Sequence, residues 1–394
     1  MDAVAIINYL VVFTLLFITI FFLLLFIRYR ESYYKIPKKT KWEPTVSIIV
    51  PAYNEGKYVG DCIESILKVD YPRNKLDIVV VDDGSTDDTY LVAKSYEKKG
   101  VRVFTKKNGG KAAALNFGLK QVHGELVATM DADSYLTKNT ITGLLPFFSD
   151  NDVMAVTPAV KIKQSSSWLK EIQRVEYLMI LFSRRILSFI ECVPVTPGPF
   201  SMFRASVFKE IGGFDEGNLV EDHEMALRLQ SKNFKIRSSV TAEVYTEPPN
   251  TIKDLLYQRV RWQRGGLRNY WNYRYLIKPE YGDFGMYFIP LNFATIVAFF
   301  VIITLMVSSI LFSPYYMRYI WLDSFQLGVN FLSLIWLTLA ILSTAFVYIS
   351  VKSFKEEKVK FRYIAFFVFF FWYLILGYNL ITLWKEATKG SKSW

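Results

Sequence analysis

Residues 76–87, LDIVVVDDGSTD, decide the fold, because an apolar run typical of a buried strand ends there in a cluster of acids. Similar apolar runs occupy residues 46–51 and 125–130, and a further strand is expected at 101–104. Helical patterns fill the intervals at 56–68, 87–98 and 110–121. Strands that alternate with helices in this way predict an α/β fold whose parallel sheet is built from βαβ units.

Ligands of parallel sheets bind beyond the carboxyl ends of the strands. The polar clusters of this sequence fall at those ends, at residues 52–55, 82–88 and 131–134. A dinucleotide fold is excluded because Gly-x-Gly-x-x-Gly does not follow the first strand. A phosphate loop is excluded because the segment around Lys111 lacks both the first glycine and the final Ser or Thr of that motif.

Four apolar blocks predict membrane helices. The chain has 394 residues, of which 52% are hydrophobic, and the blocks cover residues 5–27, 285–312, 324–351 and 363–384. About 20 apolar residues suffice to cross a bilayer. The first block is not a cleaved signal peptide, because basic residues follow it and no small-residue cleavage site is present. An interfacial aromatic belt is expected at Tyr315, Tyr316, Tyr319 and Trp321.

The distribution of basic residues orients the chain. Residues 28–41 and 352–362 are rich in Lys and Arg, whereas the loop between the second and third blocks has only Arg318. Basic loops stay cytoplasmic, so we expect the amino terminus outside, residues 28–284 inside and the carboxyl terminus outside, although three lysines in the tail oppose the last point. The net charge of +11 is attributed to anionic lipid headgroups and not to nucleic acid.

The predicted domains are an anchor and basic linker (1–41), a cytosolic catalytic domain (42–250), an amphipathic helix (251–283) and three carboxyl-terminal membrane helices (284–394). Two segments, 167–190 and 251–276, interleave aromatic and basic residues at helical spacing. Such helices either pack on a core or lie in the headgroup plane of a membrane, and the sequence leaves both open. Two cysteines without metal-type spacing exclude a disulfide framework, which suits a reducing cytosol.

Acidic motifs at two strand ends can serve a nucleotide diphosphate. Asp131 and Asp133 flank an alanine after the fourth strand, so both carboxylates can face a divalent cation, although such pairs are often solvated turns. Asp82 ends the second strand, where an aspartate can accept hydrogen bonds from a base or a ribose. The alternative there is a turn in which Ser85 or Thr86 caps the following helix.

Two later motifs can supply a base and a cation. Glu221 and Asp222 precede a predicted helix at 224–230. They can supply a general base, or they can be acids that only complement the helix dipole. In Gln258-Arg-Val-Arg261-Trp262, Arg261 can stabilise a leaving diphosphate and Trp262 can stack on a sugar. The alternative is an interfacial helix with arginines directed toward lipid phosphates. The two histidines, His123 and His223, are interpreted as a surface residue and a bystander.

The set of motifs resembles the D, DxD, ED, QxxRW signature of membrane family 2 glycosyltransferases. Its parts occur in this order at residues 51–55, 81–87, 131–133, 221–222 and 258–262. These include hyaluronan, chitin-oligosaccharide, poly-N-acetylglucosamine and cellulose synthases. The resemblance covers residues 45–275. It implies a GT-A domain beside an α-helical transmembrane bundle, an inverting mechanism, and Mg²⁺ or Mn²⁺ as the cofactor.

The resemblance also implies roles for individual residues. Asp222 would be the catalytic base, Asp133 the metal ligand, and Asp82 a contact of the nucleotide base. The other substrate-binding positions that it implies are Pro51, Tyr53, Glu55, Lys111, Asp131, Glu221, Gln258, Arg261 and Trp262. Lys111 would lie near the donor diphosphate, and residues 197–204 resemble the acceptor-side loop of the family.

The expected function is repeated addition of sugar from a nucleotide-diphosphate donor, with UDP expected, to a β-linked polysaccharide. A single-addition transferase with a membrane lipid acceptor, similar to ceramide glucosyltransferases, stays open because the predicted bundle is small. A non-catalytic channel or scaffold predicts damaged motifs and charges inside the apolar blocks, and the sequence has neither. The expected partners are the sugar donor, a polysaccharide or lipid acceptor and membrane lipids, but no nucleic acid.

Overall fold

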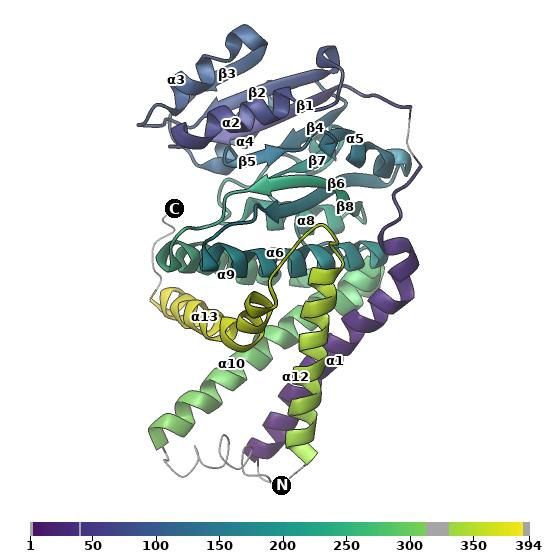
Figure 1. The fold of residues 1–394 in the computed structure, drawn as a ribbon, viewed down its shortest axis with the longest axis vertical. Coiled ribbons are helices and arrows are strands. Elements are labelled where there is room, and N and C mark those ends of the chain that lie inside the picture. The colour runs from purple at the N-terminus through teal and green to yellow at the C-terminus, as the bar shows by residue number, and fades with distance from the viewer. Residues whose placement is uncertain (1–2, 39–40, 313–330, 389–394) are drawn as a thin grey trace.

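The computed structural model describes residues 3–38, 41–312 and 331–388. An α/β domain occupies one end of the molecule (Figure 1). Below it lie two helices, α6 (Trp168–Leu187) and α9 (Ile252–Asn272). Long apolar helices, among them α1 (Ala3–Tyr33), extend away from this layer toward the other end. The order along the long axis is therefore α/β domain, paired helices and apolar bundle.

An eight-stranded sheet forms the centre of the α/β domain, in the order β3-β2-β1-β4-β7-β6-β8-β5. The strands are β1 (Val46–Ala52), β2 (Leu76–Asp82), β3 (Val101–Thr105), β4 (Leu126–Thr129), β5 (Ser134–Leu136), β6 (Val153–Ile162), β7 (Ser201–Arg204) and β8 (Lys235–Thr246). The first four pair in parallel and match the predicted strands closely. However, β7 runs antiparallel to β4 and β6, and β5 antiparallel to β8, so the sheet is mixed beyond β4 and only β6 and β8 pair in parallel among the described strands there.

Helices cover both faces of the parallel part of the sheet. On one face, α2 (Gly56–Leu67) and α3 (Thr89–Lys94) pack on side chains such as Ile48 and Ile78. On the other face, α4 (Lys111–Leu119) packs on Ile49 and Val79. This alternation follows from the two-residue period of a strand, which sends neighbouring side chains to opposite faces. Shorter helices, α5 (Thr140–Leu144), α7 (Val207–Ile211) and α8 (Glu221–Gln230), complete the domain.

Helix α6 lies between the sheet and the apolar helices, and its charged side chains bind protein groups. Arg185 donates to the carbonyl oxygens of Tyr33 at 3.0 Å and Ser238 at 2.8 Å. Arg174 pairs with Glu357, in the loop that follows the third apolar block. Because these groups are buried against protein, the contacts of α6 favour the alternative in which this helix packs on a core.

Among the residues that the structure describes, four helices are long and apolar enough to cross a membrane. They are α1, α10 (Ile289–Phe312), α12 (Phe331–Lys352) and α13 (Phe361–Ala387), and they coincide with the four predicted blocks. A π-helical turn, Phe284–Phe288, leads into α10. The predicted aromatic belt at residues 315–321, and Arg318 within it, lie outside the described residues.

Two segments that flank the apolar helices fold against the α/β domain. The hydroxyl of Tyr34, after α1, donates to the carbonyl of Ser353 at 3.0 Å. Glu357, between α12 and α13, lies 3.2 Å from Lys161 on β6. The basic linker and the basic loop of the sequence analysis are therefore next to each other, on the same side of the apolar bundle as the sheet.

The contacts of Arg185 predict a large effect on stability. Its guanidinium joins α6, the end of α1 and β8 through carbonyl oxygens that have little access to water. We expect Arg185→Met to lower the free energy of unfolding by about 3 kcal/mol, because buried acceptors lose charged donors. Lys170→Met is the matched control, since its pair with Glu247 is partly exposed and worth at most about 1 kcal/mol. Thermal unfolding in detergent measures both, and equal effects would contradict this role of Arg185.

Candidate active site

Strands β1, β2 and β4 end near one another, and polar side chains follow them. Ala52 and Asp82, the last residues of β1 and β2, are register partners. The buried carboxylate of Asp82 accepts hydrogen bonds from the backbone N–H of Ser85 at 3.2 Å and from the hydroxyl of Thr105 at 2.8 Å. Asp82 is thus fixed at the edge of the sheet where ligands of parallel strands bind.

Asp83 holds the loop that leads into α4. Its carboxylate accepts from the backbone N–H of Gly110 at 2.7 Å and of Gly109 at 3.1 Å, and pairs with Lys106 at 2.7 Å. Since this loop ends at Lys111, Asp83 positions that lysine. Asp83 has no role of its own among the residues predicted from the motifs. The glycine pair before Lys111 was the available signal, because exposed backbone amides in such a loop need an acceptor.

Side-chain hydrogen bonds join the loops after β1 and β2. Asn54 has a φ of 56°, a left-handed conformation that asparagine tolerates. Its backbone N–H donates to the hydroxyl of Ser85 at 2.9 Å, and its side-chain oxygen accepts from the backbone N–H of Thr86 at 2.9 Å. Ser85 and Thr86 therefore connect two loops and do not cap α3, whose N-cap residue is Asp88.

Lys111 connects two motifs that are distant in the sequence. Its ammonium lies 2.6 Å from Oδ1 of Asp131 and 3.0 Å from Oε1 of Glu221. Gly198 closes over this pair, because a Cβ there would lie 2.6 Å from both the ammonium and Oδ2 of Asp131. The predicted acceptor-side loop thus lies directly against the DxD motif.

Asp133, Glu55 and Asp131 form a group of carboxylates in which Lys111 pairs with Asp131 and only partly offsets the negative charge. Burial, and then the charges of Asp131 and Glu55, raise the pKa of Asp133 to about 7. Burial, and then Asp131 and Asp87, also raise the pKa of Glu55 to about 7. Hard divalent cations prefer such oxygen donors. The described residues contain no cage of three or more His, Cys, Asp and Glu side chains, but Mg²⁺ that binds with a diphosphate needs only one or two carboxylates.

Glu221 and Asp222 are the first two residues of α8, so the prediction that they precede the helix is wrong. Burial and the charge of Glu221 raise the pKa of Asp222 to about 6, while Lys111 and Arg261 oppose this shift. Burial also disfavours ionised Glu221, yet Lys111 and Arg261 lower its pKa overall. The pair thus consists of an ionised, paired Glu221 and an Asp222 that can exchange a proton near neutral pH.

The QxxRW motif lies on α9, and Arg259 connects its side chains. Arg259 forms a buried bidentate pair with Glu176 of α6, at 3.0 and 2.5 Å. It also donates to the side-chain oxygen of Gln258, and its guanidinium carbon lies 4.2 Å from the centre of the Trp262 ring. Neither Arg259 nor Glu176 is among the site residues predicted from the motifs. Only the pairing of α6 with α9 identifies them, because their positions are 83 residues apart.

Arg261 lies next to the acidic start of α8. It donates to the carbonyl of Leu219 at 2.9 Å, and its charge lowers the pKa of Glu221 and opposes the raised pKa of Asp222. Both Arg259 and Arg261 therefore bind protein groups, so the alternative in which α9 directs these arginines to lipid phosphates is wrong.

The remaining predicted residues lie around this centre. Pro51 is buried within β1, and Tyr53 follows the strand and is exposed. His223 lies 3.1 Å from the side-chain nitrogen of Asn269, and burial lowers its pKa to about 4, so it is neutral. His123 is exposed, as predicted.

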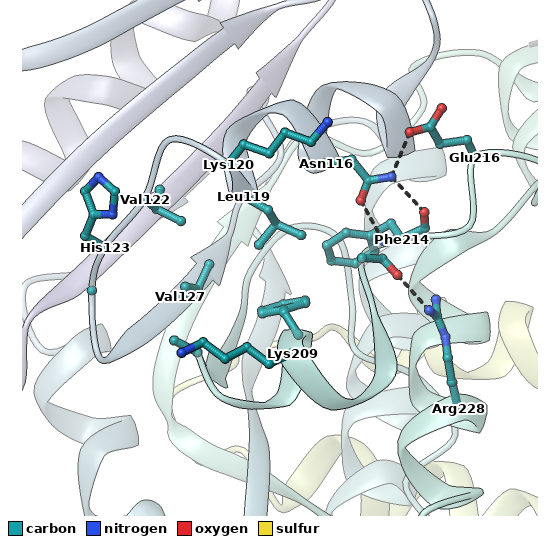
Figure 2. A pocket seen from close by; sticks show the side chains of 14 residues that line it. Asn116, Leu119, Lys120, Val122, His123, Val127, Lys209, Phe214, Glu216 and Arg228 are labelled. Carbon is teal, nitrogen blue, oxygen red and sulfur yellow. Dashed lines mark hydrogen bonds between the residues drawn. The ribbon is translucent and has the colours of Figure 1, made fainter.

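A groove of about 850 Å³, lined in part by Asn116 and Leu119, lies at the carboxyl-terminal end of α4 (Figure 2). At its rim, the side-chain amide of Asn116 donates to the carbonyl of Phe214 at 2.9 Å and to the carboxylate of Glu216 at 2.8 Å. These bonds fasten α4 to the loop that leads into α8. Helix α4 is therefore joined to α8 by the pair of Lys111 with Glu221, and to the loop before α8 by the hydrogen bonds of Asn116.

Comparison with known proteins agrees with this architecture. Residues 47–212 match the family described as glycosyl transferase family 2. A poly-β-1,6-N-acetyl-D-glucosamine synthase of Staphylococcus epidermidis is 32% identical over 235 residues, which cover 58% of this chain and 57% of the relative. The synthase of Staphylococcus aureus strain COL is 28% identical over 245 residues, covering 60% and 59%. The chain thus spans less than two thirds of the length of these relatives.

Among solved structures, a mannosyltransferase from Pyrobaculum calidifontis, in complex with GDP-Man and Mn²⁺, is similar with a TM-score of 0.62. It is 19% identical, and the similarity covers 89% of this chain and 100% of that one. The fold and the site at the sheet edge define a GT-A glycosyltransferase domain. Residues 47–212 match a glycosyl transferase family 2 domain, and the fold agrees with the fold class predicted from the motifs.

Close packing of α9 on α8 gives a prediction with an internal control. A Cβ at Gly265 would lie 2.1 Å from Cγ2 of Val220, directly before Glu221, whereas a Cβ at Gly266 meets nothing within 4 Å. We expect Gly265→Ala to displace α8 and lower kcat/KM about 10- to 100-fold, since small misplacements of reacting groups are costly. Gly266→Ala should keep its activity and stabilise the helix by about 1 kcal/mol. Initial rates of sugar transfer measure both variants, and equal activity of the two would contradict the role of Gly265 in placing α8.

Proposed function

We propose that this protein is a membrane-bound inverting glycosyltransferase that takes sugar from a nucleotide-diphosphate donor and adds it repeatedly to a β-linked polysaccharide. The observation that carries the proposal is the bridge from Asp131 through Lys111 to Glu221, because it joins a donor-binding motif to the motif that bears a base. The relatives named as poly-β-1,6-N-acetyl-D-glucosamine synthases favour polymer synthesis over a single addition.

In the proposed reaction, an acceptor hydroxyl oxygen forms a bond to the anomeric carbon of the donor sugar as the bond from that carbon to the diphosphate breaks. Asp222 takes the hydroxyl proton, and the nucleoside diphosphate leaves with the bonding electrons. A single displacement inverts the anomeric carbon. Lys111 and Arg261 supply positive charge where the leaving group becomes more negative.

Asp133 is the proposed ligand of a divalent cation, with Asp131 and Glu55 nearby. When bound, Mg²⁺ or Mn²⁺ would neutralise diphosphate charge. Asp82 is the proposed contact of the nucleotide base, since its buried carboxylate ends β2 at the sheet edge. Gln258 and Trp262, held by Arg259, are the proposed wall of the sugar pocket. Pro51, Tyr53 and Glu221 complete the proposed substrate site.

The catalytic domain, residues 42–250, is proposed to lie on the cytosolic face of a membrane, between the anchor 1–41 and the segments 251–283 and 284–394. The basic linker and the basic loop around Glu357 lie against this domain, and basic segments of this kind remain cytosolic. A donor from cytosolic nucleotide-sugar pools would then reach the sheet edge directly.

A donor screen tests the function. Purified protein is incubated with Mg²⁺ or Mn²⁺ and labelled nucleotide sugars, UDP-N-acetylglucosamine first because the relatives are named for its polymer. We expect a product of many sugars and its loss after chelation of the metal. A product that has one added sugar and extracts with lipid would favour single addition to a lipid acceptor over polymer synthesis. No transfer from any donor would end the enzyme proposal.

Removal of the proposed base gives a direct prediction. We expect Asp222→Asn to reduce kcat about 100- to 10,000-fold, because general bases contribute on that order. Donor affinity, measured by calorimetry, should change little. Asp70→Asn is the control, since Asp70 is an exposed carboxylate on the connection between α2 and β2. If Asp222→Asn keeps full turnover, another group is the base.

The raised pKa of Asp222 predicts the acid limb of the pH profile. A base works when deprotonated, so kcat/KM should fall about tenfold per pH unit below a pKa of about 6. Burial, Glu221 and Asp131 raise the pKa of Asp222, whereas Lys111 and Arg261 lower it. Glu221→Gln should therefore move the acid limb to lower pH, whatever its effect on the maximal rate. An unmoved limb would assign the titration to another group.

A further inference from the structure

The last apolar helix has a different direction from the other three. Figure 1 shows α13 across the underside of α6 and α9, whereas α12 and α10 extend away from that layer. With 27 residues, α13 is about 40 Å long, enough to cross a bilayer. Its length and composition alone therefore predict a crossing, and its contacts must decide whether it makes one.

The amino-terminal half of α13 packs on α6. Ile364, Phe367 and Phe371 are buried in one cluster with residues of α6 such as Val175 and Phe182. Near the first residue of α6, the rings of Trp168 and Phe366 lie 5.7 Å apart between centroids. This half of α13 is thus held against the helix that supports the sheet.

The carboxyl-terminal end of α13 is held by α9. Glu386 lies 2.6 Å from the guanidinium of Arg264 and 3.0 Å from that of Arg268. Its neighbour Lys385 lies 5.7 Å from the centre of the Tyr257 ring, also on α9. Both ends of α13 therefore contact the layer that carries the QxxRW motif.

These contacts conflict with a crossing. A helix that spans the hydrocarbon core separates its ends by about 30 Å along the membrane normal. Helix α9 packs on α8 through Gly265 and Val220, so its level is fixed next to the catalytic cluster. Glu386 can reach Arg264 and Arg268 only if the end of α13 is at that same level. Unpaired in hydrocarbon, Glu386 would also carry a large desolvation cost.

The outer face of α13 indicates what covers it. Phe369, Phe370, Tyr373 and Trp384 are exposed, so neither α6 nor α9 covers these aromatic side chains. Helices α1, α10 and α12, each long and apolar enough to cross a membrane, extend away from the same layer (Figure 1). Aromatic residues favour the boundary between headgroups and acyl chains. Lipid of the adjacent leaflet is therefore the occupant that fits this face.

We infer that α13 lies in the plane of the membrane, within the leaflet next to the catalytic domain, and that the carboxyl terminus is on the same side as that domain. This changes the expectation that the chain ends outside. It also removes the conflict with Lys385, which then stays on the side that basic segments prefer, whereas residues 389 and 392 lie outside the described residues. The active site thereby has an apolar helix beneath both α6 and α9.

Cysteine labelling tests the position of the carboxyl terminus without reference to transfer activity. Thr388→Cys is exposed directly after α13, and Lys355→Cys marks the loop before it. Native Cys62 and Cys192 are buried and give little background. With a membrane-impermeant maleimide, both variants should react in inside-out vesicles and not in right-side-out ones, while a cysteine added before Met1 should do the opposite. Reaction of Thr388→Cys only in right-side-out vesicles would overturn the inference.

Depth measurements give a second test. Nitroxide labels at Phe361, Phe369, Tyr373 and Trp384 occupy exposed positions along α13. An in-plane helix should give depths within about 10 Å of one another, the diameter of a helix. A crossing helix should spread the first and last labels over about 35 Å, and that spread would refute the proposal. Failure of the donor screen would leave either result unchanged, since neither measures transfer.

Discussion

The gathering of carboxylates at one end of a parallel sheet is the constraint on which this molecule depends. Such groups repel one another and lose hydration when buried, so each needs a cation or a proton. Lys111 satisfies two of them, Asp131 and Glu221, and thereby holds α8 beside the sheet. The high pKa values of Asp133 and Glu55 mark positions where charge is still uncompensated. A donor site that accepts a metal with its diphosphate follows from that imbalance.

The paired helices α6 and α9 transmit this arrangement to the apolar bundle. On the catalytic side, Arg259 and Glu176 fix the QxxRW motif, and Arg261 faces α8. On the other side, Arg185 binds the linker after α1 and Arg174 binds the loop before α13. The arginines therefore form a continuous set of contacts between the sheet and the helices below. This explains why these helices are so rich in charge while lying next to an apolar layer.

Sequence patterns predicted the first four strands well but the second half of the sheet poorly. Strands β1 to β4 are apolar runs bounded by acids or glycines, so their period and boundaries are local properties. In contrast, β7 inserts between β4 and β6 only after the chain has passed through α6. That pairing depends on where α6 returns the chain. Residues 201–204 carry no local signal of it.

The sequence by itself determined the motif set, the apolar blocks and the parallel half of the sheet, because residue type and spacing encode these over short distances. Only the tertiary structure decided which charges meet. Arg259 finds Glu176, Lys111 finds Glu221, and Glu386 finds Arg264 across more than 80 residues in each case. An ion pair depends on separation in space, which no local pattern contains. For the same reason, only the tertiary contacts distinguish the proposed orientation of α13 from that of α1, α10 and α12, since helices of similar hydropathy can either cross a bilayer or lie along it.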